Sequence, residues 1–421
     1  MDVVKQIFAL TPFTFLNHFS RIVLTIVLAR LMTPEHYGSF AALLVLSEVL
    51  LLPASVGFSS SLMRLAHPLY NAQKMDLLCG LRQVYMASIC SIGIIFVACV
   101  LMIFAVLSPR QLANEHLYYL LLLAPLGALM QTQSAFLLAL NKRTLAIISK
   151  QSLFQLLTLV FCIVIYYFNK SLSLAIICQV LILSIALVVI YQYCLISPII
   201  HSKNKAFNTK IWYQQSIILL ASGAGTILVA KLDVLLVHHL LGENAVSVFF
   251  PAVVITALVM ILSNAVTTYL KPIFLDKNTD AKRKLIITMR TFWCANSLII
   301  LALLVLAKPL LMLYGETQLT LGYEVLLIML TAQLLLPLRI VSSNLIKFTS
   351  NPLYNLYVLL FATTITVLLA LYLQKDYQLL GVAIAFSIGF VLGAILRAGI
   401  VVIHLNTPLG TLFGFHSAKA I

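Results

Sequence analysis

Four ionisable side chains fall inside long apolar stretches of the sequence: Arg21, Glu48, Lys231 and Asp233. A charge in hydrocarbon is costly, so such residues pair with one another or serve a functional site. Counting about 1.5 Å per residue from the nearest polar turn, Arg21, Glu48 and Asp233 each lie roughly 13–15 Å along a helix. The pattern therefore predicts one cation and two carboxylates near the middle of a lipid bilayer.

Polar side chains recur at i, i+3 and i+4 steps beside these charges, which places them on one face of each helix. We expect these faces to line a wet central cavity. The polar residues are Thr11, Thr14, His18 and Thr25 around Arg21, with Asn17 at the edge; Ser55 and Ser59 with Glu48; Gln215, Ser222 and Thr226 with Asp233; and Thr256, Ser263 and Thr267 in the next segment.

Lys231 does not fit this face, because it precedes Asp233 by two residues. On an unbroken helix that separation turns the two side chains about 200° apart. Either Gly223 and Gly225 loosen the helix, or Lys231 faces another partner.

Two interpretations of the central charges stay open. In the first, Arg21 pairs with Asp233 or Glu48 and holds helices together, because buried charges need partners. In the second, Arg21, with or without Lys231, attracts an anionic headgroup, while Glu48 and Asp233 balance charge or relay protons.

The segments that carry these residues are those of a membrane protein. The 421 residues are 62% hydrophobic and 9% charged, against about 25% charged in soluble domains. A spanning helix needs about 20 mostly apolar residues, and the long uninterrupted runs favour helices over barrel strands. The predicted spans are 7–29, 38–63, 84–107, 117–140, 152–168, 173–196, 213–241, 247–270, 291–313, 323–345, 353–373 and 379–404.

A weak internal repeat divides these spans into halves. Leu31–Gly38 (LMTPEHYG), after the first span, resembles Leu240–Ser247 (LLGENAVS), after the seventh. An offset of half the chain is typical of repeats related by an axis along the membrane normal. We therefore expect an all-α polytopic protein of about twelve transmembrane helices in two six-helix bundles, residues 1–200 and 201–421, around a central cavity.

Lys and Arg are concentrated in the N-terminus and every second connector, including Lys142, Arg143 and Lys150 in one and Lys271–Arg290 in another. By the positive-inside rule both termini lie in the cytoplasm, and the protein is placed in a bacterial inner membrane. The opposite connectors carry only Arg30, Arg110, Lys170, Lys308 and Lys375.

Two further arginines lie toward the cytoplasmic ends of late spans. Arg339 follows Pro337 and either guides an anion that enters from the cytoplasm or snorkels to the interface. Arg397 lies nearer its helix end, where we expect snorkelling.

Several chemistries have no signature here. The chain contains no phosphate-binding loop, H-E-x-x-H or G-x-S-x-G motif, and its seven cysteines show no paired spacing. We therefore expect no cofactor, no metal and no enzymatic activity. The formal charge of +15 lies in short connectors rather than on a basic face, so nucleic acid is not an expected partner.

Three stretches carry a family resemblance: Ala29–Phe40 (ARLMTPEHYGSF), Ala54–Arg64 (ASVGFSSSLMR) and Lys231–Ala245 (KLDVLLVHHLLGENA). They resemble Wzx-type polysaccharide (O-antigen) flippases of the multidrug/oligosaccharidyl-lipid/polysaccharide exporter superfamily. The resemblance implies two six-helix bundles around a cationic cavity that alternates between inward-open and outward-open states. It also implies a polyprenyl-pyrophosphate-linked oligosaccharide as substrate, moved from the cytoplasmic to the periplasmic leaflet. An intramembrane arginine suits a pyrophosphate.

The expected partners are that lipid-linked oligosaccharide and the bilayer, with a polysaccharide polymerase, a chain-length regulator and coupling H⁺ or Na⁺ as further candidates. One alternative is a gradient-driven exporter of small cationic drugs, with Glu48 and Asp233 as acidic sites. Another is a polysaccharide polymerase or ligase, which the short outer connectors disfavour. A drug exporter should not need Arg21.

Overall fold

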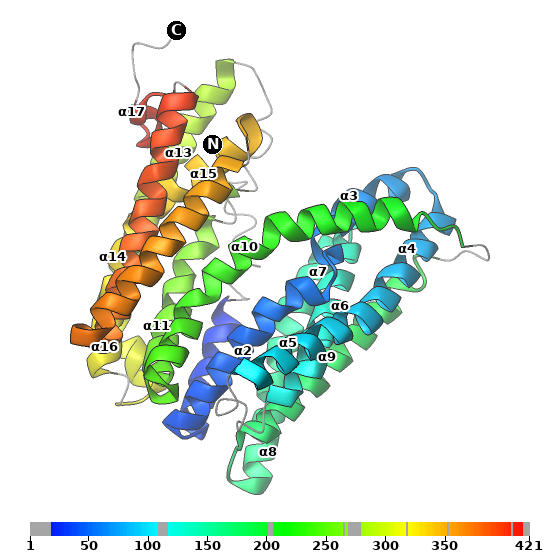
Figure 1. Cartoon of the computed structure of the whole chain (residues 1–421), viewed down its shortest axis with the longest axis horizontal. Coiled ribbons are helices and arrows are strands. Elements are labelled where there is room, and N and C mark those ends of the chain that lie inside the picture. Colours follow the sequence, from blue (N-terminus) through cyan, green and yellow to red (C-terminus); the bar gives the residue numbers. More distant parts are fainter. Residues whose placement is uncertain are drawn as a thin grey trace. The chain divides into compact units, whose positions relative to one another are not determined.

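Helices make up every regular element in the described part of the chain. The computed structural model describes residues 18–107, 117–200, 205–263, 266–267, 279–316, 319–351, 353–405 and 407–415. Hydrocarbon offers no partners to backbone N–H and C=O groups, so an apolar chain of this kind satisfies them within helices. The predicted all-α membrane fold is confirmed at this level (Figure 1).

The chain forms two compact units. We call residues 27–235 the N-terminal unit, and residues 236–421 together with 18–26 the C-terminal unit. The chain passes from one unit to the other inside two helices, the helix of residues 18–31 and α10 (Thr209–Leu241). The expected division at residue 200 concerns the sequence repeat and stays a prediction.

In the N-terminal unit, α6 is the central helix and packs against α2, α3 and α9, while α8 packs on α9. Aromatic side chains fill this core, with Phe58 and Tyr213 5.6 Å apart and Tyr85 and Phe136 5.7 Å apart between ring centroids. The elements are α2 (Pro34–Ala54), α3 (Phe58–Asn71), α4 (Met75–Ser88), π-helix η1 (Ile89–Gly93), α5 (Ile94–Leu107), η2 (Leu117–Tyr119), α6 (Leu120–Ala139), α7 (Arg143–Ile147), π-helix η3 (Ile148–Leu153), α8 (Phe154–Asn169), α9 (Leu174–Ile196) and α10 (Thr209–Leu241).

The predicted span 38–63 is wrong as one continuous helix. It breaks between α2 and α3, where Val56 and Gly57 have φ values of 51° and 78°. Glycine tolerates this left-handed backbone, and no helix continues through it. Ser55 and Ser59 therefore do not extend the stripe of Glu48; their hydroxyls lie 2.9 Å apart across the break.

In the C-terminal unit, α14 packs against α11, α13 and α16, and α15 packs along α16. A core of Met289, Phe292, Val341 and Val401 joins these helices to the short α17. The elements are a helix through residues 18–31, whose end lies in the N-terminal unit, then α11 (Glu243–Thr256), η4 (Ala257–Val259), α13 (Thr279–Tyr314), α14 (Thr320–Ala332), η6 (Gln333–Leu335), α15 (Leu336–Thr349), α16 (Leu353–His404) and α17 (Leu409–Leu412).

The last two predicted spans, 353–373 and 379–404, are both contained in α16. The helix is kinked at Gln378, whose φ of 47° and ψ of −120° are not helical. Close packing follows, because a side chain at Gly381 would collide with the backbone of Leu373. The predicted connector between the two spans, residues 374–378, thus ends at the observed kink.

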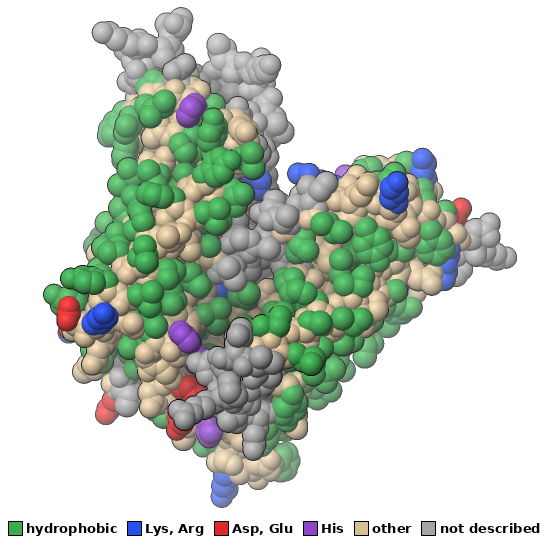
Figure 2. Space-filling view, in the orientation of Figure 1, with side chains coloured by type: hydrophobic (Ala, Val, Ile, Leu, Met, Phe, Trp, Pro, Cys, Tyr) green, Lys and Arg blue, Asp and Glu red, His purple; other side chains and the backbone are tan. Residues whose placement is uncertain are grey.

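The surface is apolar along the helices and charged at their ends. Figure 2 shows hydrophobic side chains over much of the visible face, and Leu298, Val305 and Ile403 are each more than half exposed. Among the described residues, eight helices are long and apolar enough to cross a membrane. Exposed apolar surface that runs along whole helices is rare on soluble proteins but normal where lipid is the solvent.

Candidate functional site

Glu48 of α2 and Lys231 of α10 form an ion pair within the N-terminal unit. Their side chains are 29% and 25% exposed, so the pair is partly buried. Helix α10 runs without interruption from Thr209 to Leu241, so Gly223 and Gly225 do not redirect Lys231. Of the two alternatives for this lysine, the second holds, and the partner is Glu48.

A second lysine interacts electrostatically with the same carboxylate. Lys150 lies in the π-helical turn η3, inside the apolar helix Thr144–Asn169, and interacts electrostatically with Glu48. The predicted span 152–168 thus starts too late as a helix, whereas the cytoplasmic position of Lys150 stays a prediction. Glu48 thus interacts with two cations, Lys150 and Lys231, and the group carries a formal net charge of +1. We call these three residues the charge cluster.

Neighbouring helices fix the position of the turn that carries Lys150. Gln192 of α9 donates a hydrogen bond of 2.9 Å to the hydroxyl of Ser149. The hydroxyl of Ser134, on α6, donates to the backbone oxygen of Ala146 at 2.9 Å. Such π-turns are frequent at functional sites because they re-aim a side chain within a helix.

Asp233 behaves differently from Glu48. Its carboxylate accepts a hydrogen bond of 2.8 Å from the backbone N–H of Val234. It lies on the helix face opposite Lys231, as its spacing predicts. Asp233 still interacts electrostatically with Lys231, but the ion pair described for this lysine is with Glu48.

Arg21 and His18 lie on the helix that ends at residue 31, and both are partly buried. One turn after Arg21, Thr25 is buried and its hydroxyl lies 2.8 Å from that of Tyr314 on α13. This contact attaches the first helix to the C-terminal unit. Asn17, Thr11 and Thr14 lie outside the described residues, and the pairing of Arg21 with Asp233 or Glu48 stays a prediction.

Arg339 of α15 lies against α16, with its guanidinium 4.2 Å from the ring centroid of Phe390. Arg397 is only 6% exposed. The expectation that Arg397 snorkels is therefore wrong: Asn355 and the Gly393 carbonyl accept its hydrogen bonds inside the unit.

The remaining members of the polar stripes are distributed unevenly. Thr256 and Ser263 are buried, and Thr267 accepts a hydrogen bond from Asn344 at 3.4 Å. Gln215 is exposed. The side chains of Ser222 and Thr226 lie outside the described residues, so a cavity lined by all four faces stays a prediction.

Chemically, the described residues offer fixed charges rather than reactive groups. No group of three His, Cys, Asp or Glu side chains that fits a metal ion occurs among them. The charge cluster has one cation in excess, and Arg339 adds a guanidinium in the other unit. Such groups suit electrostatic binding of an anion in a partly dehydrated environment.

Solved structures place this architecture in a class. The lipid II flippase MurJ in an inward closed conformation has a TM-score of 0.70 and 15% identity, covering 96% of this chain and 89% of that chain. An inward-facing multidrug resistance MATE family transporter of the MOP superfamily has 0.67 and 15%, covering 93% and 94%. The MATE transporter VcmN of Vibrio cholerae, as a variant, has 0.63 and 16%, covering 97% and 98%. The chain is thus a membrane protein with the fold of these transporters.

The family follows from the sequence itself. Residues 27–292, more than half of the chain, match the family described as polysaccharide biosynthesis protein. The chain belongs to this family. No curated protein matches the sequence. The resemblance is therefore confirmed for the polysaccharide biosynthesis family and for the fold shared with the MATE and MurJ structures.

Proposed function

We propose that the protein is a flippase that moves an undecaprenyl-pyrophosphate-linked oligosaccharide, an O-antigen or similar repeat unit, from the cytoplasmic to the periplasmic leaflet of the inner membrane. The observation that carries this proposal is the charge cluster, which lies within the family match at residues 27–292. A polysaccharide family supplies the substrate class, and the excess cation suits its pyrophosphate.

In this proposal, cations from both units bind the anionic headgroup. Arg21, His18 and Asn17 are the proposed headgroup-binding residues of the first helix, and Lys231 with its partner Glu48 are those of the N-terminal unit. Lys150 adds a positive charge near Glu48. Asp233 and Glu48 are the candidate proton or Na⁺ carriers, because transport needs a gradient where no nucleotide-binding loop exists.

Transport proceeds by alternating access in this proposal. The lipid tail stays in the bilayer while the headgroup crosses through the protein. Apolar helix surfaces such as those of Leu298 and Val305 suit contact with the tail. A polysaccharide polymerase and a chain-length regulator are the proposed partners on the periplasmic side.

Deleting the gene in its native host tests the function. We expect the mature surface polysaccharide to disappear and its lipid-linked units to accumulate facing the cytoplasm. Both are measured, by gel analysis of the polymer and by accessibility of the units in oriented vesicles. Normal polymer in a clean deletion would refute the proposal.

Complementation of that deletion tests the site. Arg21→Ala should leave little polymer at normal protein abundance, whereas Arg30→Ala, nine residues along the same helix and exposed, should restore it. Full polymer with Arg21→Ala would exclude this arginine from headgroup binding.

A multidrug exporter is the second candidate, because MATE family transporters share the fold. Deletion would then increase susceptibility to cationic drugs, and Glu48→Gln would act alike, while polysaccharide stays normal. Arg21→Ala would leave drug resistance unchanged. Measuring drug susceptibility and polymer in the same deletion strain separates the two functions.

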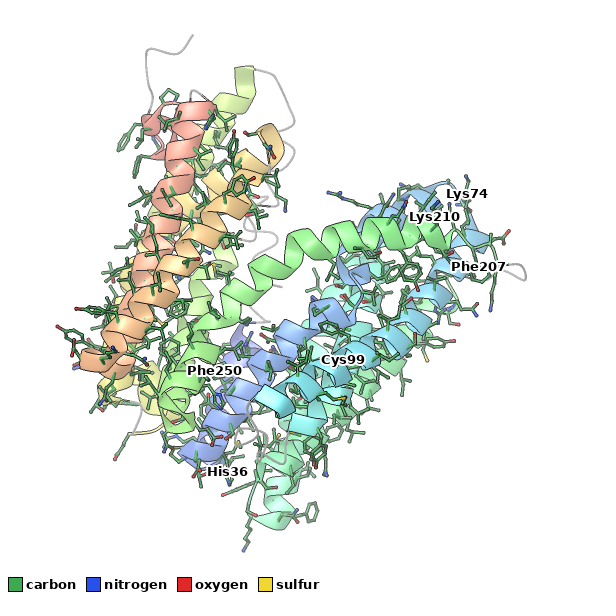
Figure 3. The ribbon with its side chains drawn as sticks, in the orientation of Figure 1. His36, Lys74, Cys99, Phe207, Lys210 and Phe250 are labelled. Carbon is green, nitrogen blue, oxygen red and sulfur yellow. The ribbon has the colours of Figure 1, made fainter. Side chains whose placement is uncertain are left out.

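Both termini are proposed to face the cytoplasm. Figure 3 shows Lys74, Lys210 and Phe207 at one end of the N-terminal unit and His36 at the other, with Cys99 between. In a cysteine-free variant, a cysteine at position 375 should react with an impermeant maleimide in intact cells. A cysteine at position 142 should react only after the membrane is opened.

A further inference from the structure

Two arginines meet in the C-terminal unit without a described carboxylate between them. The Arg339 guanidinium of α15 lies 4.2 Å from the ring centroid of Phe390, which is two turns before Arg397 on the same face of α16, and the two positive side chains interact electrostatically. Like charges in a low-dielectric interior repel, so this arrangement is costly unless an anion offsets it. The structure therefore points to a ligand rather than to an internal ion pair.

Arg397 is held in place by the protein. Its Nε donates to Asn355 Oδ1 at 3.2 Å and its Nη1 to the Gly393 carbonyl at 2.9 Å. Asn355 is oriented in turn, because its Nδ2 donates to the Ser343 carbonyl at 2.8 Å. The chain thus uses two of the five N–H donors of Arg397 for positioning.

Arg339 makes no hydrogen bond within the described residues, and its guanidinium carbon lies 4.2 Å from the centroid of the Phe390 ring. The ring fixes the plane of the guanidinium by cation–π contact. Its N–H donors are left for another molecule. A pre-oriented planar fork of this kind matches the oxygen atoms of a phosphate.

The residues share two helix faces. Arg339 and Ser343 are four apart on α15, while Phe390, Gly393 and Arg397 follow i, i+3 and i+7 on α16. Such spacings bring side chains to one side of each helix. Because α15 and α16 pack along each other, the two faces meet.

The described acidic residues of this unit lie elsewhere. Glu324, on α14, precedes Arg339 by 15 residues, about 22 Å of helix. Asp376 lies beyond the kink at Gln378, which is 19 residues from Arg397, about 28 Å. The two other acidic residues with described side chains, Glu243 and Glu316, lie at the start of α11 and just after α13, at ends proposed to face the periplasm. None of the four is placed to neutralise the arginine pair.

The pair lies toward the ends proposed to face the cytoplasm. Arg339 is ten residues from the end of α15, about 15 Å, and Arg397 is seven from the end of α16, about 10 Å. A phosphorylated headgroup in the cytoplasmic leaflet lies near this depth.

We infer that Arg339 and Arg397, positioned by Phe390, Asn355 and the Gly393 carbonyl, form an anion site for a phosphate or pyrophosphate group, separate from the charge cluster of the N-terminal unit. The biological identity of this ligand, the pyrophosphate of the lipid-linked substrate at entry from the cytoplasm, rests on the proposed function. The site itself does not.

Binding to purified full-length protein in nanodiscs of neutral phosphatidylcholine tests the site. The probes are inorganic pyrophosphate and farnesyl pyrophosphate, measured by titration calorimetry. We expect Arg339→Gln to raise the Kd about tenfold or more, because it removes a charged hydrogen-bond donor. Lys347→Gln, an equal charge change at an exposed position of α15, should leave the Kd unchanged.

A glycine pair tests Arg397 without removing its buried charge. A Cβ at Gly393 would lie 3.0 Å from Arg397 Nη1, whereas a Cβ at Gly399 would meet nothing within 4 Å. We expect Gly393→Ala to weaken binding several-fold and Gly399→Ala to have no effect. Arg339→Gln removes no described hydrogen bond, and Gly393→Ala keeps the backbone carbonyl that accepts from Arg397, so we expect these variants to fold.

The outcomes separate the ligand source and the two proposals. Equal binding of both probes indicates a site for the phosphate group itself, and binding of farnesyl pyrophosphate alone indicates a lipid headgroup. No binding of either, an unchanged Kd in Arg339→Gln or an equal loss in Lys347→Gln overturns the site. If the deletion strain makes normal polysaccharide but the purified protein still binds the probes through Arg339, the flippase function is refuted and the anion site stands.

Discussion

The Lys231 ammonium of α10 is paired with the Glu48 carboxylate of α2, while Asp233, two residues further along α10, is not part of this pair. A two-residue step rotates the side chain by about 200° around the helix, so Lys231 and Asp233 cannot both point to α2. Glu48 is thus the ion-pair partner of Lys231, whereas Asp233 interacts with the same lysine electrostatically and accepts a hydrogen bond from the backbone N–H of Val234.

Breaking the Glu48–Lys231 pair should destabilise the protein unless both charges are removed. Glu48→Gln leaves Lys231 without its paired carboxylate, and Lys231→Met leaves Glu48 with Lys150 alone, so both single variants should unfold at lower temperature in detergent. The double variant should recover much of the loss, with a coupling free energy of about 0.5–3 kcal/mol. Additive losses in the thermal-unfolding cycle would show that the pair contributes no interaction.

Lys150 should matter for transport despite its place near a connector. Lys150→Gln lowers the positive charge at Glu48, so we expect reduced surface polymer in the complementation assay at wild-type protein abundance. Lys142→Gln removes the same charge at an exposed turn nearby and should restore full polymer. Equal effects of the two substitutions would assign the change to membrane topology rather than to the site.

The sequence predicted most helix ends because hydropathy reports directly on the solvent of each segment. The predicted span 173–196 coincides with α9 (Leu174–Ile196), and the predicted connector 374–378 ends at the kink at Gln378. The break at Val56 and Gly57 was not foreseen, since Pro53 and Gly57 occur in an apolar run that reads as one helix. Whether such a run bends depends on packing against another helix.

The sequence likewise predicts that charged residues lie in the membrane but not which residues they pair with. Their presence inside the membrane follows from composition, but their partners depend on which helices pack together. Lys150 was missed because a π-turn has no sequence period that distinguishes it from α-helix. Arg397 was misplaced because one of its acceptors, Asn355, lies on the other side of the kink in α16, while the second, the Gly393 carbonyl, is one turn before it.

The Thr25–Tyr314 hydrogen bond should stabilise attachment of the first helix to α13. Tyr314→Phe removes one partner of a buried pair 2.8 Å apart, so we expect a loss of about 1 kcal/mol. Thr25→Val should cost a similar amount, and the double variant less than the sum. Thr364→Val, at an exposed position of α16, is the control and should be neutral in the same unfolding measurement.

Gly57 should tolerate no larger side chain. Its φ of 78° is strained for other residues, and an added Cβ would collide with the backbone oxygen of Ser216 on α10 and lie 3.0 Å from the Leu220 side chain. The hydroxyls of Ser61 and Ser216, 2.7 Å apart, hold α3 against α10 at the same place, so neither helix is free to withdraw. Gly57→Ala should therefore reduce folded protein sharply, measured by fluorescence-detected size exclusion in detergent. Gly399→Ala meets nothing within 4 Å and should match the wild type. A normal elution profile for Gly57→Ala would mean that α3 and α10 are not in close contact in the membrane.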